Sequence, residues 1–265
     1  MLELKGIYKT FNAGTVNEKR AIDNLNLTLE NGDFVTIIGG NGAGKSTTLN
    51  LIAGVFPVDA GTINLNGFNL THLPEHKRAK YLGRVFQDPM MGTAATMGIE
   101  ENLALAYRRG QRRGLHAGIT NEERKLYREK LATLGLGLED RMTSKVGLLS
   151  GGQRQALTLL MATLRKPDLL LLDEHTAALD PVVAERVLHI TQDIVAENHI
   201  TTMMVTHNIG AALSLGTRTI MLERGRIVLD LSGETRDRLD VPGLLALYRE
   251  ACGAELDNDR MLLAH

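Results

Sequence analysis

The sequence has few of the features that mark secreted, membrane-spanning or nucleic-acid-binding proteins. Its 265 residues include a single cysteine, Cys252, which cannot form an internal disulfide and fits a reducing compartment. No stretch approaches the roughly 20 apolar residues that span a bilayer. Glu3, Lys5 and Lys9 interrupt any apolar N-terminal segment, so we expect no secretory signal. A formal net charge of −1 predicts no nucleic-acid partner, because such proteins depend on many phosphate contacts.

A glycine-rich segment at residues 39–46 fits the phosphate-binding pattern of Gly, four residues and then Gly-Lys-Ser. An apolar, β-branched strand at 34–38 precedes it, and a helix-like run at 47–53 follows and stops at Gly54. Helix N-termini present free N–H groups and a positive dipole end to anions. We expect a nucleotide to contact Gly39, Gly40, Asn41, Gly42, Ala43, Gly44, Lys45, Ser46 and Thr47.

The chemistry of this loop assigns two roles. Lys45 is expected to reach the β- and γ-phosphates as a point charge, and the Ser46 hydroxyl is expected to bind Mg²⁺. The alternative is a glycine-rich turn followed by an unrelated Lys-Ser pair.

A second glycine-rich segment, Leu149-Ser150-Gly151-Gly152-Gln153, also precedes a helix-like run. Ser150 is a good N-cap, and the two glycines allow a close approach to a γ-phosphate; the bland alternative is a capped helix. One nucleotide does not need two helix ends from one chain. The pair of segments therefore predicts a nucleotide held between two protein surfaces.

Two carboxylates end a short apolar strand at residues 168–172. Asp173 at the strand tip can hold Mg²⁺, directly or through a water. The adjacent Glu174 can orient a water for in-line attack. The alternative is two acids that only cap the strand end.

Three further polar residues follow strands or begin a helix. Gln87 follows a strand at 84–86, and its amide can bridge Mg²⁺ or water to a moving segment, although a lone glutamine is usually a solvated loop residue. His207 ends a strand at 201–206, where a neutral imidazole can donate to phosphate. Asp180 can cap the helix that opens with Pro181 and can also contact a partner across a dimer.

Together these motifs resemble the ATP-binding subunit of an ABC transporter over roughly residues 1–230. Their order and spacing all agree with that family. The resemblance identifies residues 39–46 as Walker A, 149–153 as the LSGGQ signature, 169–174 as Walker B with the catalytic glutamate, Gln87 as the Q-loop glutamine, 177–180 as the D-loop and His207 as the switch histidine.

The resemblance implies an α/β fold with a P-loop NTPase (RecA-like) core, an N-terminal antiparallel β layer and an inserted α-helical subdomain. Residues 1–265 form one ABC ATPase domain on this interpretation, with a core at 1–87 and 156–265 and the insertion at 88–155. Strands are expected near 2–8, 25–30 and 62–65, with hairpin turns at Asn66-Gly67 and Asn31-Gly32.

Helices are expected at 99–107, at 121–134 and at 241–252, with a frayed tail after the last. Thr120 is the expected cap of the second helix, with Glu123 three residues later.

The resemblance also implies an activity and partners. The chain is expected to hydrolyse ATP with Mg²⁺ as cofactor and to form a homodimer in which Ser150, Gly151, Gly152 and Gln153 of one copy face the Walker A loop of the other. Integral membrane permease subunits and an extracytoplasmic substrate-binding protein are the further expected partners. This interpretation predicts a peripheral protein on the cytoplasmic face of the membrane that powers an importer of a small solute.

Base recognition is weakly marked. Phe11 matches the family's adenine-stacking aromatic, and Tyr8 is the second candidate; either can instead be core packing. His175 departs from the family, which usually has proline after the glutamate. This variant and residues 93–102 resemble a subfamily of bacterial systems thought to take up amino acids.

Two segments are candidates for permease contact. Residues 88–92, after Gln87, carry two methionines that can adapt to a groove. The basic run 108–113 is a solvated loop or a contact with a membrane domain or anionic lipids.

Other functional classes share some of these motifs. A soluble ABC-type ATPase that acts as a scaffold, as in iron–sulfur cluster biogenesis, has the same set, so the partners must distinguish it. A nucleic-acid-acting ABC ATPase usually adds a coiled-coil insertion or a second cassette, and neither is visible. A GTPase is disfavoured because no Asn-Lys-x-Asp motif occurs.

Overall fold

The computed structural model describes residues 1–111 and 118–252. The chain divides into two compact units, Met1–Arg78 together with the chain from Ile200 onward, and Ala79–His199. The boundaries predicted for an inserted lobe, residues 88–155, stay a prediction.

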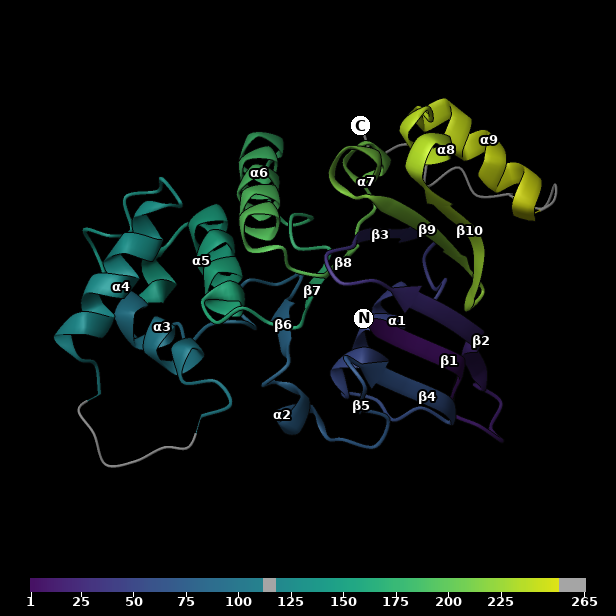
Figure 1. Cartoon of the computed structure of the whole chain (residues 1–265), viewed down its shortest axis with the longest axis horizontal. Coiled ribbons are helices and arrows are strands. Elements are labelled where there is room, and N and C mark those ends of the chain that lie inside the picture. Colours follow the sequence, from purple (N-terminus) through teal and green to yellow (C-terminus); the bar gives the residue numbers. More distant parts are fainter. Residues whose placement is uncertain (112–117, 253–265) are drawn as a thin grey trace. The chain divides into compact units, whose positions relative to one another are not determined.

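The N-terminal part of the first unit is an antiparallel sheet, as the sequence predicts. Its strands lie in the order β2–β1–β4–β5 (Figure 1). The Asn66-Gly67 turn joins the last two strands and confirms the predicted hairpin, with φ of 50° and 82° at the two positions. The strands are β1 (Leu2–Phe11), β2 (Lys19–Leu29), β4 (Ala60–Leu65) and β5 (Phe68–Asn69).

A second set of strands in this unit surrounds β3 (Phe34–Gly39). β8 (Thr202–Val205) and β9 (Arg218–Glu223) flank β3 and run parallel to it. β10 (Arg226–Ser232) pairs antiparallel with β9. Every residue of β3 is buried, which explains its unbroken apolar and β-branched sequence.

The hairpin predicted at Asn31-Gly32 is wrong. β2 before it and β3 after it pair in different sheets, so the segment connects two sheets. It is still a tight turn, in which the Asp33 N–H donates to the Glu30 carbonyl at 3.2 Å. Asn-Gly specifies the local reversal, but packing of the whole chain chooses which strands pair.

Helices cover this second set of strands. α1 (Lys45–Ala53) ends at Gly54, whose φ of 84° is the left-handed stop that the sequence predicts. α9 (Val241–Cys252) has its predicted bounds and packs beside β10 (Figure 1). Residues 253–265, predicted to fray, lie outside the described residues. The other helices of the unit are α2 (Glu75–Arg78), α7 (Ile209–Leu215) and α8 (Gly233–Asp237).

A buried arginine caps the far end of α1. Arg78 is 2% exposed and donates to the carbonyls of Leu51 and Ile52 at 2.7 and 2.8 Å. It also donates to Leu73 and Thr71 at 2.7 and 3.1 Å. Its charge therefore meets the negative end of the helix dipole and satisfies carbonyls that helix geometry leaves unpaired.

The second unit combines two parallel strands with a group of helices. β6 (Leu82–Val85) and β7 (Leu169–Asp173) pair in parallel. Ile99, Leu103, Tyr127, Leu131 and Leu157 form part of one apolar cluster among the helices. These helices are α3 (Ile99–Tyr107), α4 (Asn121–Ala132), a 3₁₀ turn (Val146–Leu148), α5 (Gly151–Thr163) and α6 (Pro181–Asn198).

Local signals predicted these helices well. Thr120 and Glu123 form the predicted reciprocal cap of α4. α4 ends at Ala132, two residues before the predicted end, because the chain turns at Gly135 with a φ of 62°.

The prediction that the basic run 108–113 is a solvated loop is wrong for two of its arginines. Arg108 donates to both Glu123 oxygens at 2.8 and 2.9 Å, and Arg109 donates to the carbonyls of Ala162 and Arg165 near the end of α5. Arg112 and Arg113 lie outside the described residues.

No helix within residues 1–111 and 118–252 is long and apolar enough to cross a membrane.

Candidate functional site

The glycine-rich loop between β3 and α1 has the backbone conformation that a phosphate cradle needs. Gly39, Gly42 and Gly44 have φ of 150°, 80° and 105°. A Cβ on Gly39 would lie 2.2 Å from the Leu222 carbonyl oxygen, so a side chain cannot be accommodated there. Lys45 is 5% exposed, and its Nζ donates to the Gly39 and Gly40 carbonyls at 2.8 and 3.1 Å. The lysine therefore curls back over the loop.

The first turn of α1 carries the other predicted phosphate and metal contacts. Ser46 is exposed and Thr47 is half-buried, while Thr48 is buried and bonds back to the Gly44 carbonyl at 2.9 Å. Asn41 is exposed at the top of the loop. Ser46 is thus an exposed residue in the first turn of this helix.

The turn between β9 and β10 supports the loop from behind, although it belongs to none of the sequence motifs. The Gly225 N–H donates to the Ala43 carbonyl at 2.9 Å, and its own carbonyl accepts from the Asp23 N–H at 3.0 Å. Gly225 has a φ of 79°, and a Cβ there would lie 2.6 Å from the Ala21 carbonyl oxygen. Only glycine fits between the loop and β2.

We therefore expect Gly225→Ala to lower both the free energy of unfolding and ATP affinity. The new methyl meets rigid backbone at a left-handed position, which costs about 2 to 4 kcal/mol, and the loop must shift with it. Urea unfolding and calorimetric ATP titration measure the two effects. Gly233→Ala is the matched control, because Gly233 has a φ of 57° with nothing within 4 Å of a Cβ. Equal effects from both variants would contradict the support role.

His207 lies at the same edge as the loop within the first unit. The Thr206 N–H donates to the Ile37 carbonyl at 3.1 Å, so the end of β8 runs beside the end of β3. Asn208 caps α7 by accepting from the Ala211 N–H at 2.8 Å. His207 is exposed between the strand and this helix, at the carboxyl end of the parallel strands where α/β folds bind ligands.

Phe11 ends β1 and is half-buried. Its ring packs edge-on against Phe56 with centroids 5.2 Å apart, and Lys9 Nζ lies 5.6 Å from its centroid. Tyr8 is also half-buried. Stacking of Phe11 on adenine stays a prediction. The contact with Phe56 was not predicted from the sequence.

The second unit carries the two predicted carboxylates, Asp173 and Glu174, at the carboxyl end of its parallel strands. Val85 is paired in register with Leu172, so Gln87 beyond β6 and Asp173 at the end of β7 leave the strands at the same side. Gln87 is exposed, and Asp173 and Glu174 are half-buried. The arrangement presents an amide and two carboxylates at one carboxyl edge.

The signature segment forms a capping box at the start of α5. The Gln153 N–H donates to Ser150 Oγ at 3.3 Å, and the Ser150 N–H donates to Gln153 Oε1 at 3.2 Å. Gly152 is buried, and a Cβ there would lie 2.1 Å from Val183 at the start of α6. Close packing therefore explains Gly152, whereas Gly151 is exposed and keeps an accessible backbone.

Two residues of α5 that lie outside the sequence motifs hold the segments around this helix. Arg154 donates to the carbonyls of Gly147 and Leu149 at 3.1 and 3.2 Å, which holds the turn before the signature. Gln155 is fully buried and donates to the Phe86 carbonyl at 3.2 Å, one residue before Gln87. The signature helix is therefore bonded to the Q-loop backbone.

The loop from Glu174 to Asp180 is anchored at both ends. Asp180 caps α6 as predicted, accepting from the Val183 N–H at 3.1 Å. His175 is 2% exposed, and its Nε2 lies 3.0 Å from Thr191 Oγ1. Burial lowers the pKa of His175 to about 4, so the imidazole is neutral.

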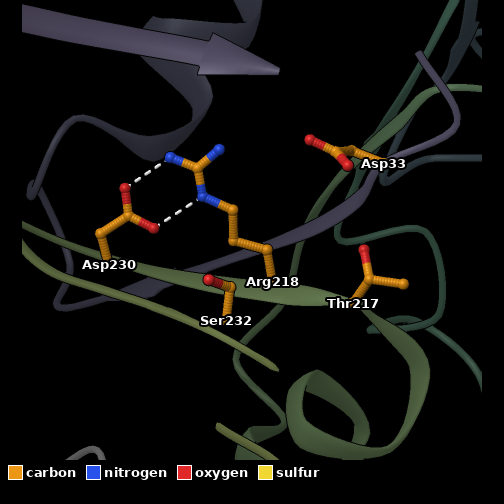
Figure 2. A pocket seen from close by; sticks show the side chains of 5 residues that line it. All are labelled: Asp33, Thr217, Arg218, Asp230 and Ser232. Atoms are coloured by element: carbon orange, nitrogen blue, oxygen red, sulfur yellow. Dashed lines mark hydrogen bonds and ion pairs between the residues drawn. The ribbon is translucent and has the colours of Figure 1, made fainter. Parts of the chain in front are cut away.

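A hollow of about 480 Å³ opens in the first unit, away from the loop. Asp33, Thr217, Arg218, Asp230 and Ser232 line it, and Figure 2 shows the guanidinium paired with Asp230 at 2.6 and 2.5 Å. The remaining guanidinium nitrogen donates to a β2 carbonyl at 2.7 Å. The hollow lies where β3 and β9 begin, opposite to the edge that carries the glycine-rich loop. It is therefore not the candidate site.

The comparisons with known proteins agree with the motifs. The family described as "ABC transporter" matches residues 22–177. The chain is 42% identical, over 95% of its length and all of the relative's, to a tyrosine transport ATP-binding protein of Clostridioides difficile (strain R20291). It is 35% identical over 91% of its length to the spermidine/putrescine import ATP-binding protein PotA of Pasteurella multocida (strain Pm70), and it spans 60% of that protein.

Among solved structures, the chain resembles the ATP-binding cassette MJ0796. That structure is a dimer in a post-hydrolysis state, bound to ADP and Pi. The TM-score is 0.75 at 30% identity, over 88% of this chain and 98% of the other. The chain belongs to the ABC transporter family and is an ATPase of that family.

Proposed function

We propose that this chain is the ATP-hydrolysing subunit of a bacterial importer, works as a homodimer and serves the uptake of an amino acid. The observation that carries the proposal is the full-length similarity to a tyrosine transport ATP-binding protein. The second similar relative is named as an import protein for polyamines, so the cargo is the finer part of the proposal.

ATP binds at the glycine-rich loop on this proposal. Lys45 supplies a positive charge to the β- and γ-phosphates, and the N–H groups that begin α1 donate to the same oxygens. Phe11 stacks on the adenine. The side chains of Ser46, Gln87 and Asp173 offer the oxygen donors that Mg²⁺ prefers, and Ser46, an exposed residue at the start of α1, fits that role. When bound, Mg²⁺ neutralises charge on the transferred phosphoryl group.

Hydrolysis then depends on positioning and charge. Glu174 accepts a proton from the attacking water and orients it, and His207 donates to the γ-phosphate. Gln87 bridges the metal site to its mobile loop. Little covalent work is left to the protein in such a reaction.

The homodimer follows from the two glycine-rich segments. Each copy has one phosphate loop and one signature segment, so two copies form two complete sites. Ser150, Gly151, Gly152 and Gln153 of one copy face the nucleotide of the other, and Asp180 contacts the partner. The dimeric state of the similar cassette supports this arrangement.

Integral membrane permease subunits are the proposed partners, together with an extracytoplasmic substrate-binding protein. The segment after Gln87 is the proposed contact, because Met90 and Met91 are 45% and 69% exposed. The chain then acts as a peripheral protein on the cytoplasmic face of the membrane.

Isolation of the native complex tests this function. The tagged chain is purified in mild detergent from membranes of its own organism, and its partners are identified by mass spectrometry. We expect integral membrane proteins in a fixed ratio, and ATP hydrolysis by the reconstituted complex that rises with amino acids more than with a polyamine. Only soluble partners would contradict the importer and favour the scaffold ATPase.

A further inference from the structure

The residue after Glu174 is a buried histidine, His175, which is hydrogen-bonded to helix α6. His175 leaves the end of β7 and inserts its ring beneath α6, where it meets Thr191. Thr191 is fully buried and belongs to the inward stripe of α6 with Val187 and Val195. The contact joins a loop residue to the interior face of a long helix.

The hydrogen bonds of Thr191 determine which group donates. Its hydroxyl donates to the Val187 carbonyl at 2.8 Å in its own helix. Since that proton is used, Thr191 Oγ1 accepts from the Nε2–H of His175 at 3.0 Å. The bond is directional, so it fixes the orientation of the ring.

Glu174 itself has an unusual backbone. Its φ is 45°, in the left-handed region that a glutamate rarely adopts. Such a conformation is unfavourable for a residue with a Cβ and persists only where the surroundings enforce it. Before Glu174, β7 is held by its buried leucines. After it, the Glu174 carbonyl accepts from the Ala177 N–H at 2.9 Å, and the ring of His175 is bonded to Thr191.

We propose that His175, held by Thr191, positions the Glu174 carboxylate for hydrolysis. The inference rests on the proposed function, in which Glu174 orients the water. Loss of the anchor lets the turn relax toward an ordinary φ, which moves the carboxylate while the ATP contacts remain. Displacement by about 1 Å is enough to lower turnover up to 10²-fold.

Thr191→Val and His175→Leu test the proposal, because each removes the bond and keeps most of the packing. We expect kcat for ATP hydrolysis to fall about tenfold in each, with ATP affinity unchanged within twofold. The double variant should lose no more than either single one. His175→Gln should recover part of kcat, since its amide N–H can reach the same hydroxyl. Thr163→Val is the control: Thr163 bonds back to its own helix at Leu159 and to no other element in the described contacts.

Urea unfolding of every variant separates this role from simple stability. An unchanged kcat per nucleotide-binding site in folded Thr191→Val would overturn the proposal, and so would a fall in ATP affinity that matches the fall in kcat. Glu174→Gln distinguishes failure of this inference from failure of the proposed catalytic role of Glu174. If Glu174→Gln is inactive while the anchor variants turn over normally, only this inference fails; if Glu174→Gln itself turns over normally, the catalytic role of Glu174 fails.

Discussion

Glu174→Gln should lower kcat for ATP hydrolysis by about 10²- to 10⁴-fold, the usual contribution of a positioned general base. Glutamine has nearly the same size and can adopt the same left-handed backbone, but its amide cannot accept the proton of the water. ATP affinity should stay close to that of the natural protein, because Lys45 and the loop N–H groups are untouched. Phosphate release and calorimetric ATP titration measure the two quantities.

The same variant should accumulate as an ATP-bound dimer. Because hydrolysis reopens the proposed dimer, a slow variant stays closed with nucleotide held by both copies. Size-exclusion chromatography with ATP should show a dimer that disappears when ADP replaces ATP. Asp168→Asn, just before the opposite end of β7, is the control and should hydrolyse ATP like the natural protein without accumulating the ATP-bound dimer. Rapid turnover by Glu174→Gln would remove this residue from the catalytic role.

Lys45→Ala should weaken ATP binding by about 10²-fold, or about 3 kcal/mol, in line with the loss of a buried, hydrogen-bonded charge contact. The side chain is 5% exposed and already lies over the loop, so little reorganisation is needed to meet the phosphates. Calorimetry with Mg²⁺-ATP measures the loss. Hydrolysis at limiting ATP should fall with it.

Lys45 also bonds to the Gly39 and Gly40 carbonyls, so the loop could change shape in Lys45→Ala. Lys45→Met keeps the aliphatic stem and should show the same loss of affinity with less loss of stability. Lys166→Ala removes an equal charge from an exposed site and should bind ATP normally. Normal binding by both Lys45 variants would rule out the phosphate contact.

The features that the sequence predicted correctly are those decided by local chemistry. Asp180, Thr120 and Ser150 each cap a helix, and each lies three residues before the N–H group that its side chain accepts from. The pattern is therefore visible in a short stretch of sequence. Gly54 ends α1 because a left-handed stop favours glycine. The hairpin at Asn66-Gly67 is equally local.

The features that the sequence missed join residues far apart in the chain. Gly225 meets Ala43, and Gln155 meets Phe86. Neither pair has a short motif, because ordinary backbone carbonyls accept the bonds. The failure at Asn31-Gly32 has the same origin, since strand pairing depends on the whole core.

The sequence by itself determined the motifs of this protein: a glycine-rich loop with Lys45 and Ser46, two carboxylates at a strand end, and the family to which this order of motifs belongs. These follow from residue type and spacing, which govern helix ends, turns and phosphate contacts directly. Only the tertiary structure decided what supports them, the turn at Gly225 behind the loop and Thr191 behind His175. Such supports form where distant segments pack together, so their partners are chosen by the fold.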